Sequence, residues 1–150
     1  AQKEPVDIFA MAKSIADRLK TIASKNDVTI NVSGEKTVIN GINYILDEII
    51  YNLCENAVKY NKTGGEVNVF VGIEYNKPII KVSDTGIGIP KDQCSRIFER
   101  FYRVDKSHSR KIGGTGLGLS IVKHGAAFHN AHIEVNSKPG EGTVFTVVFD

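Results

Sequence analysis

Asp84-Thr85-Gly86-Ile87-Gly88-Ile89-Pro90 is the stretch from which the organisation of this chain can be inferred. The apolar residues just before it, Ile80 and Val82 among them, alternate and predict a strand that ends at the carboxylate. The two glycines let the backbone turn sharply and come close to a ligand. An acid beside such a turn can accept a hydrogen bond from an amine while a flat ring packs over the turn. By itself, however, the pattern is also that of an ordinary turn.

Two further segments accompany this stretch. Upstream lies Asn52-x-x-x-Asn56-Ala57-x-Lys59-Tyr60, and downstream lies Gly113-Gly114-Thr115-Gly116-Leu117-Gly118-Leu119. The three together resemble the N box and the first two glycine boxes of the ATP-binding domain of sensor histidine kinases. That domain belongs to the GHKL superfamily, shared with gyrase B, heat-shock chaperones and MutL-type repair proteins. The similarity covers about residues 38–150, with 97–103 like the family's F box and 140–143 like its last glycine motif.

The expected fold is α+β, a two-layer α/β sandwich of the Bergerat type, in which three main helices pack on one face of a mixed, mostly antiparallel sheet. Periodicity predicts helices over about 6–24, 42–61, 91–101 and 116–129. Strands are expected near 28–32, 38–39, 66–75, 78–83, 133–135 and 143–149, with a hairpin turn at Asn76-Lys77. Residues 102–115 lack periodicity and form the expected lid. On the last helix, His124 and His129 are expected to pack inward.

Length and composition fit one soluble domain over residues 1–150. The chain is 41% hydrophobic and 24% charged, as ordinary globular proteins are. Its formal net charge of +2 is too small to indicate nucleic acid or a membrane surface as partner. The two cysteines, Cys54 and Cys94, have no metal-binding spacing and are expected to be reduced thiols. With no apolar run of membrane-spanning length, the chain is expected to be cytoplasmic, and the resemblance implies a membrane-bound sensor around it.

Polar residues border the apolar stripe of the helix expected over 42–61. Asparagine has only moderate helix propensity, so the presence of Asn52 and Asn56 in a helix, four residues apart, requires an explanation. Helix capping or interhelical hydrogen bonds are one explanation. An amide oxygen directed at Mg²⁺, which prefers hard oxygen ligands, is the other. By resemblance, Asn56 is the Mg²⁺ ligand, Lys59 adds positive charge near the phosphates of ATP, and Tyr60 lies against the base or ribose.

The resemblance also implies how the nucleotide is held. Asp84 accepts from the adenine amino group at the turn that contains Gly86, Gly88 and Ile89, and Thr143 supports this contact through water. Arg103 steadies the γ-phosphate and Lys106 contributes from the lid. The glycine-rich segment before the last helix meets the phosphates with its amides and the helix N-terminus. Its expected nucleotide-binding residues are Gly114, Thr115, Gly116, Leu117, Gly118 and Leu119.

One departure from the superfamily bears on the reaction. Hydrolysing members carry a water-activating glutamate where this chain has Asn52, and an amide cannot take up a proton near neutral pH. The expected function is therefore to bind Mg-ATP and donate its γ-phosphoryl group to a histidine on a separate dimerisation domain. The catalytic residues expected are Asn56, Lys59 and Arg103. None of the chain's four histidines has the sequence context of the phosphoacceptor.

The resemblance further implies a response regulator downstream, a monomeric isolated domain and a homodimeric full-length kinase. Three alternatives remain open at this point. The chain could be a fragment of an ATP-gated chaperone or repair ATPase, a nucleotide-binding module that only regulates a partner, or a serine kinase of the anti-sigma-factor type. Asn52 and the short lid argue against the first, the complete set of motifs against the second, and the F box against the third.

Overall fold

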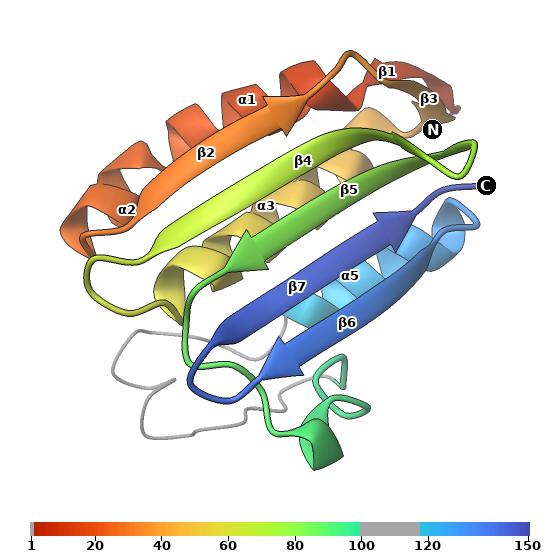
Figure 1. Cartoon of the computed structure of the whole chain (residues 1–150). Coiled ribbons are helices and arrows are strands. Elements are labelled where there is room, and N and C mark those ends of the chain that lie inside the picture. The colour runs from red at the N-terminus through yellow and green to blue at the C-terminus, as the bar shows by residue number, and fades with distance from the viewer. Residues whose placement is uncertain (1, 100–117) are drawn as a thin grey trace.

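A five-stranded sheet forms one layer of the computed structural model, which describes residues 2–99 and 118–150 (Figure 1). In spatial order its strands are β2 Thr29–Gly34, β4 Glu66–Glu74, β5 Lys77–Asp84, β7 Gly142–Val148 and β6 His132–Lys138. Only the β2–β4 pair is parallel among these, and the other three pairs are antiparallel. The expected mixed, mostly antiparallel sheet is confirmed.

Helices form the second layer and cover one face of this sheet (Figure 1). Those described are α1 Ile8–Arg18, α2 Lys20–Lys25, α3 Asn43–Lys59 and α5 Gly118–Phe128. Every second strand residue points at this layer and is buried, as the alternation of Val67, Val69 and Val71 in β4 shows. Two short strands, β1 Glu4–Asp7 and β3 Val38–Gly41, pair antiparallel in a separate sheet.

The first helix differs from the expected single helix over 6–24. It begins at Ile8, because Val6 pairs with Ile39 in the small sheet and Asp7 caps the helix, accepting from the backbone N–H groups of residues 9 and 10. It ends at Arg18, because Leu19, with φ −91° and ψ 0°, departs from regular α-helical values, and α2 begins at Lys20.

Two other local predictions were wrong in detail. The β4–β5 turn is made by Tyr75 and Asn76, one residue earlier than expected, and their φ angles of 52° and 65° are those of a type I′ turn. In place of a helix over 91–101, the described part holds a 3₁₀ helix, Lys91–Gln93, and turns up to Glu99. Their hydrogen bonds join residues three apart.

Helix α5 presents an unexpected face to the protein. Ile121, His124 and Phe128 lie on its exposed side, so the expected inward packing of His124 was wrong. The buried side is made mostly of small residues. A Cβ added at Gly125 would lie 3.0 Å from the side chains of Ile45 and Ile49 on α3. The two helices therefore approach closely through the small side, which turns the larger apolar residues outward.

His129, by contrast, packs inward as expected. It is 7% exposed and joins the end of α5 to the start of α3. The backbone N–H of Ile42 donates to His129 Nε2 at 3.0 Å, so this nitrogen is an acceptor. His129 Nδ1 is then the donor to the Gly125 carbonyl, at 2.8 Å. These two partners select the neutral imidazole with its proton on Nδ1.

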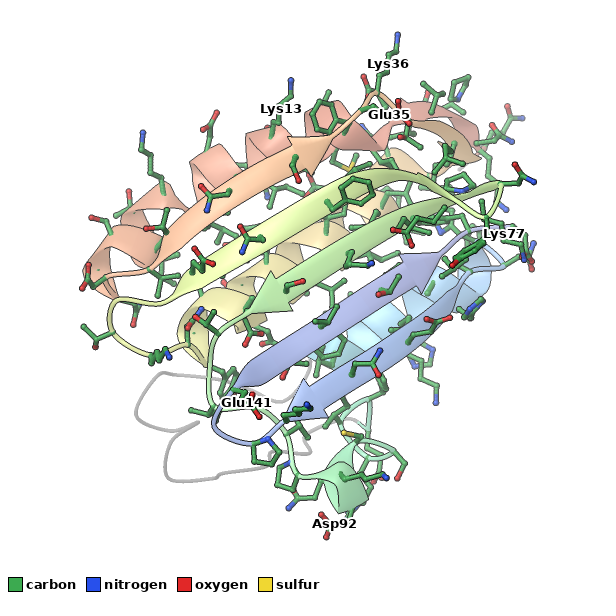
Figure 2. All side chains as sticks on the ribbon, viewed as in Figure 1. Lys13, Glu35, Lys36, Lys77, Asp92 and Glu141 are labelled. Atoms are coloured by element: carbon green, nitrogen blue, oxygen red, sulfur yellow. The ribbon has the colours of Figure 1, made fainter. Side chains whose placement is uncertain are left out.

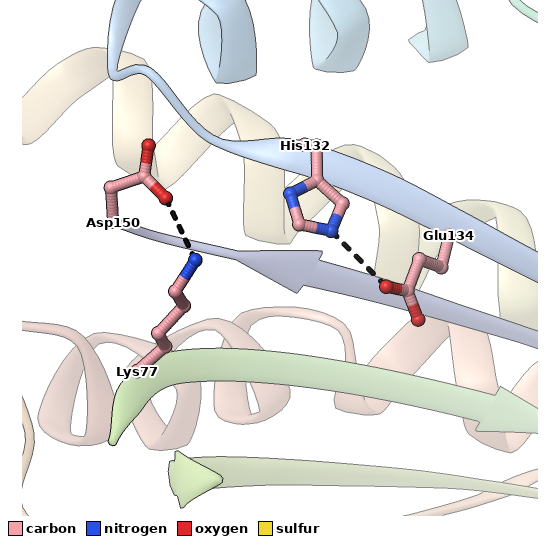
Figure 3. A network of polar contacts seen from close by, with 4 residues as sticks. All are labelled: Lys77, His132, Glu134 and Asp150. Atoms are coloured by element: carbon pink, nitrogen blue, oxygen red, sulfur yellow. Dashed lines mark hydrogen bonds and ion pairs between the residues drawn. The ribbon is translucent and has the colours of Figure 1, made fainter. Parts of the chain in front are cut away.

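The face of the sheet away from the helices carries exposed polar pairs. Lys77 pairs with Asp150 at 3.2 Å and His132 with Glu134 at 3.1 Å, near the end of the sheet where the chain terminates (Figure 3). Exposed pairs of this kind contribute little stability. Both described chain ends lie opposite the β6–β7 turn (Figure 1), where Glu141 is found (Figure 2). The candidate site lies at the β6–β7 turn end.

Candidate functional site

Three polar residues stand side by side on neighbouring strands at one end of the sheet. Asp84 ends β5 and pairs with Thr143 on β7, which in turn pairs with Ser137 on β6. Directly opposite residues share a face, and Asp84 continues the inward series of Ile80 and Val82. The apolar inner face therefore ends in a polar row, Asp84–Thr143–Ser137, directed toward the helix layer.

Asp84 is held by one of its two carboxylate oxygens. Its Oδ1 accepts from the backbone N–H of Gly86 at 2.9 Å and from that of Thr143 at 3.3 Å. Its Oδ2 has no protein partner within residues 2–99 and 118–150. Burial raises the pKa of this carboxyl above its usual value, and the two backbone hydrogen bonds offset part of that rise. The site thus presents a fixed, partly desolvated acceptor.

The turn after Asp84 has room only for glycine. A Cβ at Gly86 would overlap the carbonyl oxygen of Tyr60, and one at Gly88, where φ is +73°, would overlap that of Lys138. Ile87 joins the turn to the end of α3 and to the β6–β7 turn. Its N–H donates to the Tyr60 carbonyl at 3.1 Å, and its carbonyl accepts from Gly140 N–H at 2.8 Å. The glycines therefore allow two backbone segments to meet beside Asp84.

Asn61 and Thr85 form a polar bridge on one side of this turn, and neither was among the residues expected in the site. Thr85 Oγ1 accepts from Glu66 N–H at 3.0 Å and donates to Asn61 Oδ1 at 3.1 Å, while Asn61 Nδ2 donates to the Glu66 carbonyl at 3.0 Å. The bridge connects the end of α3, the start of β4 and the end of β5. No pattern in the chain indicates it, because Thr85 is 24 residues from Asn61 and 19 from Glu66.

Ser137 forms the corresponding connection on the other side. Its Oγ lies 2.7 Å from Ile89 N, 3.1 Å from the Gly142 carbonyl oxygen and 2.8 Å from Thr143 Oγ1. Sequence reasoning missed this residue too. Its signal was present, however: Ser137 occupies the inward position after Ile133 and Val135, where another apolar residue is expected.

Helix α3 contributes the two asparagines. Asn52 donates from Nδ2 to the Glu48 carbonyl at 2.7 Å, and its Oδ1 would lie 3.0 Å from a Cβ added at Gly118, the first residue of α5. Asn56 lies one turn further along the same helix face. It is half-buried, and its amide has no hydrogen-bond partner in the described part of the chain. An unpaired, half-buried amide is suited to a ligand or a metal ion.

The remaining predicted residues fall into two groups. Lys59 forms an ion pair with Glu55 on the same helix at 3.6 Å, so its charge is already partly balanced. Tyr60, Ile89, Gly118 and Leu119 are described, and all four are partly exposed near the elements above. The others lie outside the described residues, as does the whole of the lid expected over 102–115: Arg103, Lys106, Gly114, Thr115, Gly116 and Leu117.

Neither cysteine is part of the site. Cys54 and Cys94 are unpaired, as expected, and burial raises the pKa of the Cys54 thiol to about 12. Residues 2–99 and 118–150 hold no cluster of three or more His, Cys, Asp or Glu side chains able to hold a metal ion by themselves. A closed metal cage is thus absent from this part. Mg²⁺ commonly takes one or two protein oxygens and fills its shell with waters and phosphates.

Gly142→Ala is expected to destabilise the protein more than Gly140→Ala. Both glycines have positive φ, +131° and +81°, which costs alanine about 1–2 kcal/mol. A Cβ at Gly142 would also overlap the Asp84 carbonyl oxygen, whereas Gly140 has open space. We expect about 1–2 kcal/mol of additional loss for Gly142→Ala, because backbone overlap is not relieved by rotamer changes. Chemical denaturation of both variants measures the difference, and equal losses would contradict the close approach.

Comparison with known proteins agrees with this geometry. Residues 41–150 match the family described as histidine kinase-, DNA gyrase B-, and HSP90-like ATPase. The chain is 40% identical over 145 residues to the sensor-like histidine kinase SenX3 of Mycolicibacterium smegmatis, covering 96% of this chain and 38% of that protein. It is 37% identical over 147 residues to the phosphate regulon sensor protein PhoR of Pseudomonas aeruginosa, covering 97% and 33%. The chain thus spans only part of the length of these relatives.

Solved structures show the same fold. The mycobacterial sensor histidine kinase MprB superposes with a TM-score of 0.84 at 28% identity, over 98% of this chain and 96% of that one. Full-length ShkA, in complex with AMPPNP, gives a TM-score of 0.84 at 27% identity, over 98% and 30%.

The chain therefore belongs to the histidine kinase-, DNA gyrase B- and HSP90-like ATPase family. Within that family it is a catalytic kinase domain of the sensor histidine kinase class, as its relatives SenX3 and PhoR are sensor kinases. None of the helices in residues 2–99 and 118–150 combines the length and apolar character needed to cross a bilayer.

Proposed function

We propose that this domain binds Mg-ATP and donates the γ-phosphoryl group to a histidine on a separate dimerisation and phosphoacceptor domain. The observation that carries the proposal is the geometry of Asp84. One carboxylate oxygen is held by two backbone N–H groups, while the other has no described protein partner and lies beside the Gly86–Gly88 turn. The AMPPNP bound to the structurally similar ShkA supports a nucleotide as the ligand.

At the base end, Asp84 Oδ2 accepts a hydrogen bond from the exocyclic amino group of adenine. Guanine and hypoxanthine present a carbonyl oxygen at the same position, which a carboxylate repels. The Gly86–Gly88 turn fixes the height of the base above the sheet, because Ile87 connects it to the end of α3 and to the β6–β7 turn. Tyr60 adjoins this turn and flanks the base or ribose.

At the phosphate end, the proposed groups come from α3 and the start of α5. The Asn56 amide oxygen is of the hard type that Mg²⁺ prefers, and its lack of a described partner fits a ligand role. When bound, Mg²⁺ would neutralise charge on the phosphates. Lys59 exchanges Glu55 for a phosphate oxygen. Gly118 opens α5, whose N-terminal amides favour an anion. We assign Arg103, Lys106 and residues 114–117 to the phosphates on the resemblance alone.

Asn52 argues for transfer of the phosphoryl group rather than hydrolysis. Its Nδ2 is engaged with the Glu48 carbonyl, and an amide cannot act as the base that activates water. The carboxylate of Glu55, which adjoins Asn56 in sequence, is paired with Lys59. The domain therefore positions the γ-phosphate and leaves the acceptor to another domain, a task that depends on orientation and charge neutralisation.

The proposed setting follows from the relatives, which are sensor kinases of greater length. We propose that the chain is the cytoplasmic catalytic domain of a membrane-bound homodimeric sensor. A response regulator would receive the phosphoryl group downstream. The isolated domain is proposed to be a monomer.

Mixing this chain with the dimerisation segment of its own kinase and Mg-ATP tests the proposal. We expect acid-labile phosphohistidine on that segment, very slow release of inorganic phosphate by the isolated chain, and no phosphorylation of the chain itself. Phosphate release and ³²P transfer measure these outcomes. Rapid hydrolysis with no transfer to the histidine segment would instead assign the chain to the ATPase members of its family.

A further inference from the structure

The hydroxyl of Ser137 lies at the meeting point of three elements near Asp84. It contacts the backbone N–H of Ile89 in the glycine turn, the carbonyl oxygen of Gly142 at the start of β7, and the hydroxyl of Thr143. All three contacts are at most 3.1 Å long. Ser137 and Thr143 are partners in the β6–β7 register, and Thr143 is in turn the partner of Asp84.

Counting protons assigns a direction to each of these contacts. Ile89 N–H can only donate, so Ser137 Oγ accepts there. The Gly142 carbonyl can only accept, so it takes the single proton of Ser137. With the Ser137 proton on the Gly142 carbonyl, the remaining contact, between the two hydroxyls, is made by the Thr143 proton donated to Ser137 Oγ. In this arrangement, Thr143 has no proton left to donate, and its oxygen can serve a ligand only as an acceptor.

Thr143 stands next to Asp84 in the polar row and is 5% exposed, so its hydroxyl has few alternative partners. Its backbone N–H is also directed at Asp84 Oδ1, at 3.3 Å. The end of the row therefore offers two neighbouring acceptors, the free carboxylate oxygen of Asp84 and the oxygen of Thr143. Two acceptors together suit the hydrogens of an amino group or of a water molecule bridging to the base.

We propose that Ser137 is a specificity-determining residue, which acts through Thr143 to keep the site selective for a base with an amino group. This inference rests on the proposed function, ATP binding with the base at Asp84. Ser137 is a positioning residue and does not itself contact the nucleotide. Without its hydroxyl, the Thr143 proton becomes free to donate to a carbonyl oxygen, so bases that carry one are rejected less strongly.

The test compares ATP with ITP, which differ only at the edge where adenine has its amino group and hypoxanthine a carbonyl oxygen and N1–H. Calorimetry gives the ratio of their affinities. We expect Ser137→Ala to lower the preference for ATP by about 5- to 10-fold, the equivalent of one hydrogen bond. Ser83→Ala is the matched control. Ser83 is also on a strand, adjoins Asp84 and has no side-chain hydrogen bond to the described residues, so the preference should not change.

A double-mutant cycle separates this role from a structural one. If Ser137 acts through Thr143, Ser137→Ala should leave the ATP-to-ITP ratio unchanged in a Thr143→Val background. Loss of the Ile89 contact alone would weaken both nucleotides equally and lower the melting temperature without changing the ratio. An unchanged ratio in Ser137→Ala, or an equal change with and without the Thr143 hydroxyl, would overturn the inference.

A second pair of variants keeps the test informative if Ser137→Ala folds poorly. Ser137→Thr and Ser137→Val have nearly the same shape, and only the first retains the hydroxyl, so the preference for ATP should survive in the first and fall in the second. The wild type serves a separate purpose. If it binds ATP and ITP equally well, or binds neither, the proposed function itself fails, whereas a selective wild type with a selective Ser137→Val variant contradicts only the role of Ser137.

Discussion

Asn56→Ala is expected to reduce phosphoryl transfer to the dimerisation segment on the order of 1,000-fold, as loss of one preorganised charge-stabilising group does in other enzymes. The reason is the state of this amide: half-buried, one turn from Asn52 on α3, and without a described partner. Its removal costs the fold no described hydrogen bond. The melting temperature should therefore stay close to that of the wild type while transfer is lost.

The dependence on Mg²⁺ identifies what Asn56 does. If its amide oxygen is a metal ligand, Asn56→Ala should need more Mg²⁺ for half-maximal transfer, and Asn56→Asp, which retains an oxygen, should recover part of the activity. Asn43→Ala provides the control, because it makes the same change at an exposed position in the first turn of α3. Wild-type transfer by Asn56→Ala at low Mg²⁺ would remove Asn56 from the catalytic machinery.

Asp84→Asn is expected to weaken ATP binding by about 1–3 kcal/mol, or roughly 5- to 150-fold. The two backbone N–H groups of Gly86 and Thr143 require an acceptor at Oδ1, so the asparagine oxygen must take that place. Its NH₂ group then replaces Oδ2. This group is a hydrogen-bond donor, as the adenine amino group is, so the two cannot form a hydrogen bond through the amine's protons. For the same reason, the preference for ATP over GTP should shrink. Calorimetry with both nucleotides measures each effect.

Stability should respond in the opposite sense. Burial raises the pKa of Asp84 in the folded protein above its unfolded value, so ionising this carboxyl costs folding free energy. That cost is absent below the unfolded pKa and is complete once the pH exceeds the folded pKa. At neutral pH, Asp84→Asn removes the buried charge but keeps the acceptor for both N–H groups. We therefore expect a melting temperature equal to or above that of the wild type.

Asp92→Asn is the control for this substitution. It removes one negative charge from an exposed side chain in the 3₁₀ helix that follows the turn (Figure 2). If it weakened ATP as much as Asp84→Asn does, long-range charge rather than a direct contact would be responsible. Unchanged ATP affinity in Asp84→Asn would contradict the base assignment, and a marked fall in its melting temperature would contradict the stability argument.

Local pattern was sufficient for several of the elements and for part of the site. The alternation ending at Asp84 located β5 and its glycine turn, because burial on one face repeats every second residue along a strand. The apolar stripe of α3 likewise located the helix and placed Asn52 and Asn56 on one of its faces. These inferences needed only the residues within each element. The polar inward position of Ser137 was visible in the same way, although it was not interpreted.

The tertiary structure alone decided which residues meet. Periodicity reports that a helix has two unlike faces but not which partner lies opposite. On α5, the small residue Gly125 packs against α3, while the larger apolar residues Ile121 and Phe128 face outward. Similarly, β1 exists only because β3, more than thirty residues later, supplies its partner. Val6 therefore joined a strand where its neighbours suggested a helix.

The site shows the same division between what the sequence determined and what the tertiary structure decided. Residue types and spacing within Asp84–Pro90 and along α3 determined that an acid, a glycine turn and two amides were available. The hydrogen bonds that orient them join residues distant in sequence: Thr85 to Asn61 at a separation of 24 residues, Ile89 to Ser137 at 48, and Thr143 to Asp84 at 59. Such contacts depend on strand order and register, which no single segment encodes. The types of functional group in the site could therefore be inferred from the sequence. The hydrogen-bond geometry that orients these groups could be seen only in the folded sheet.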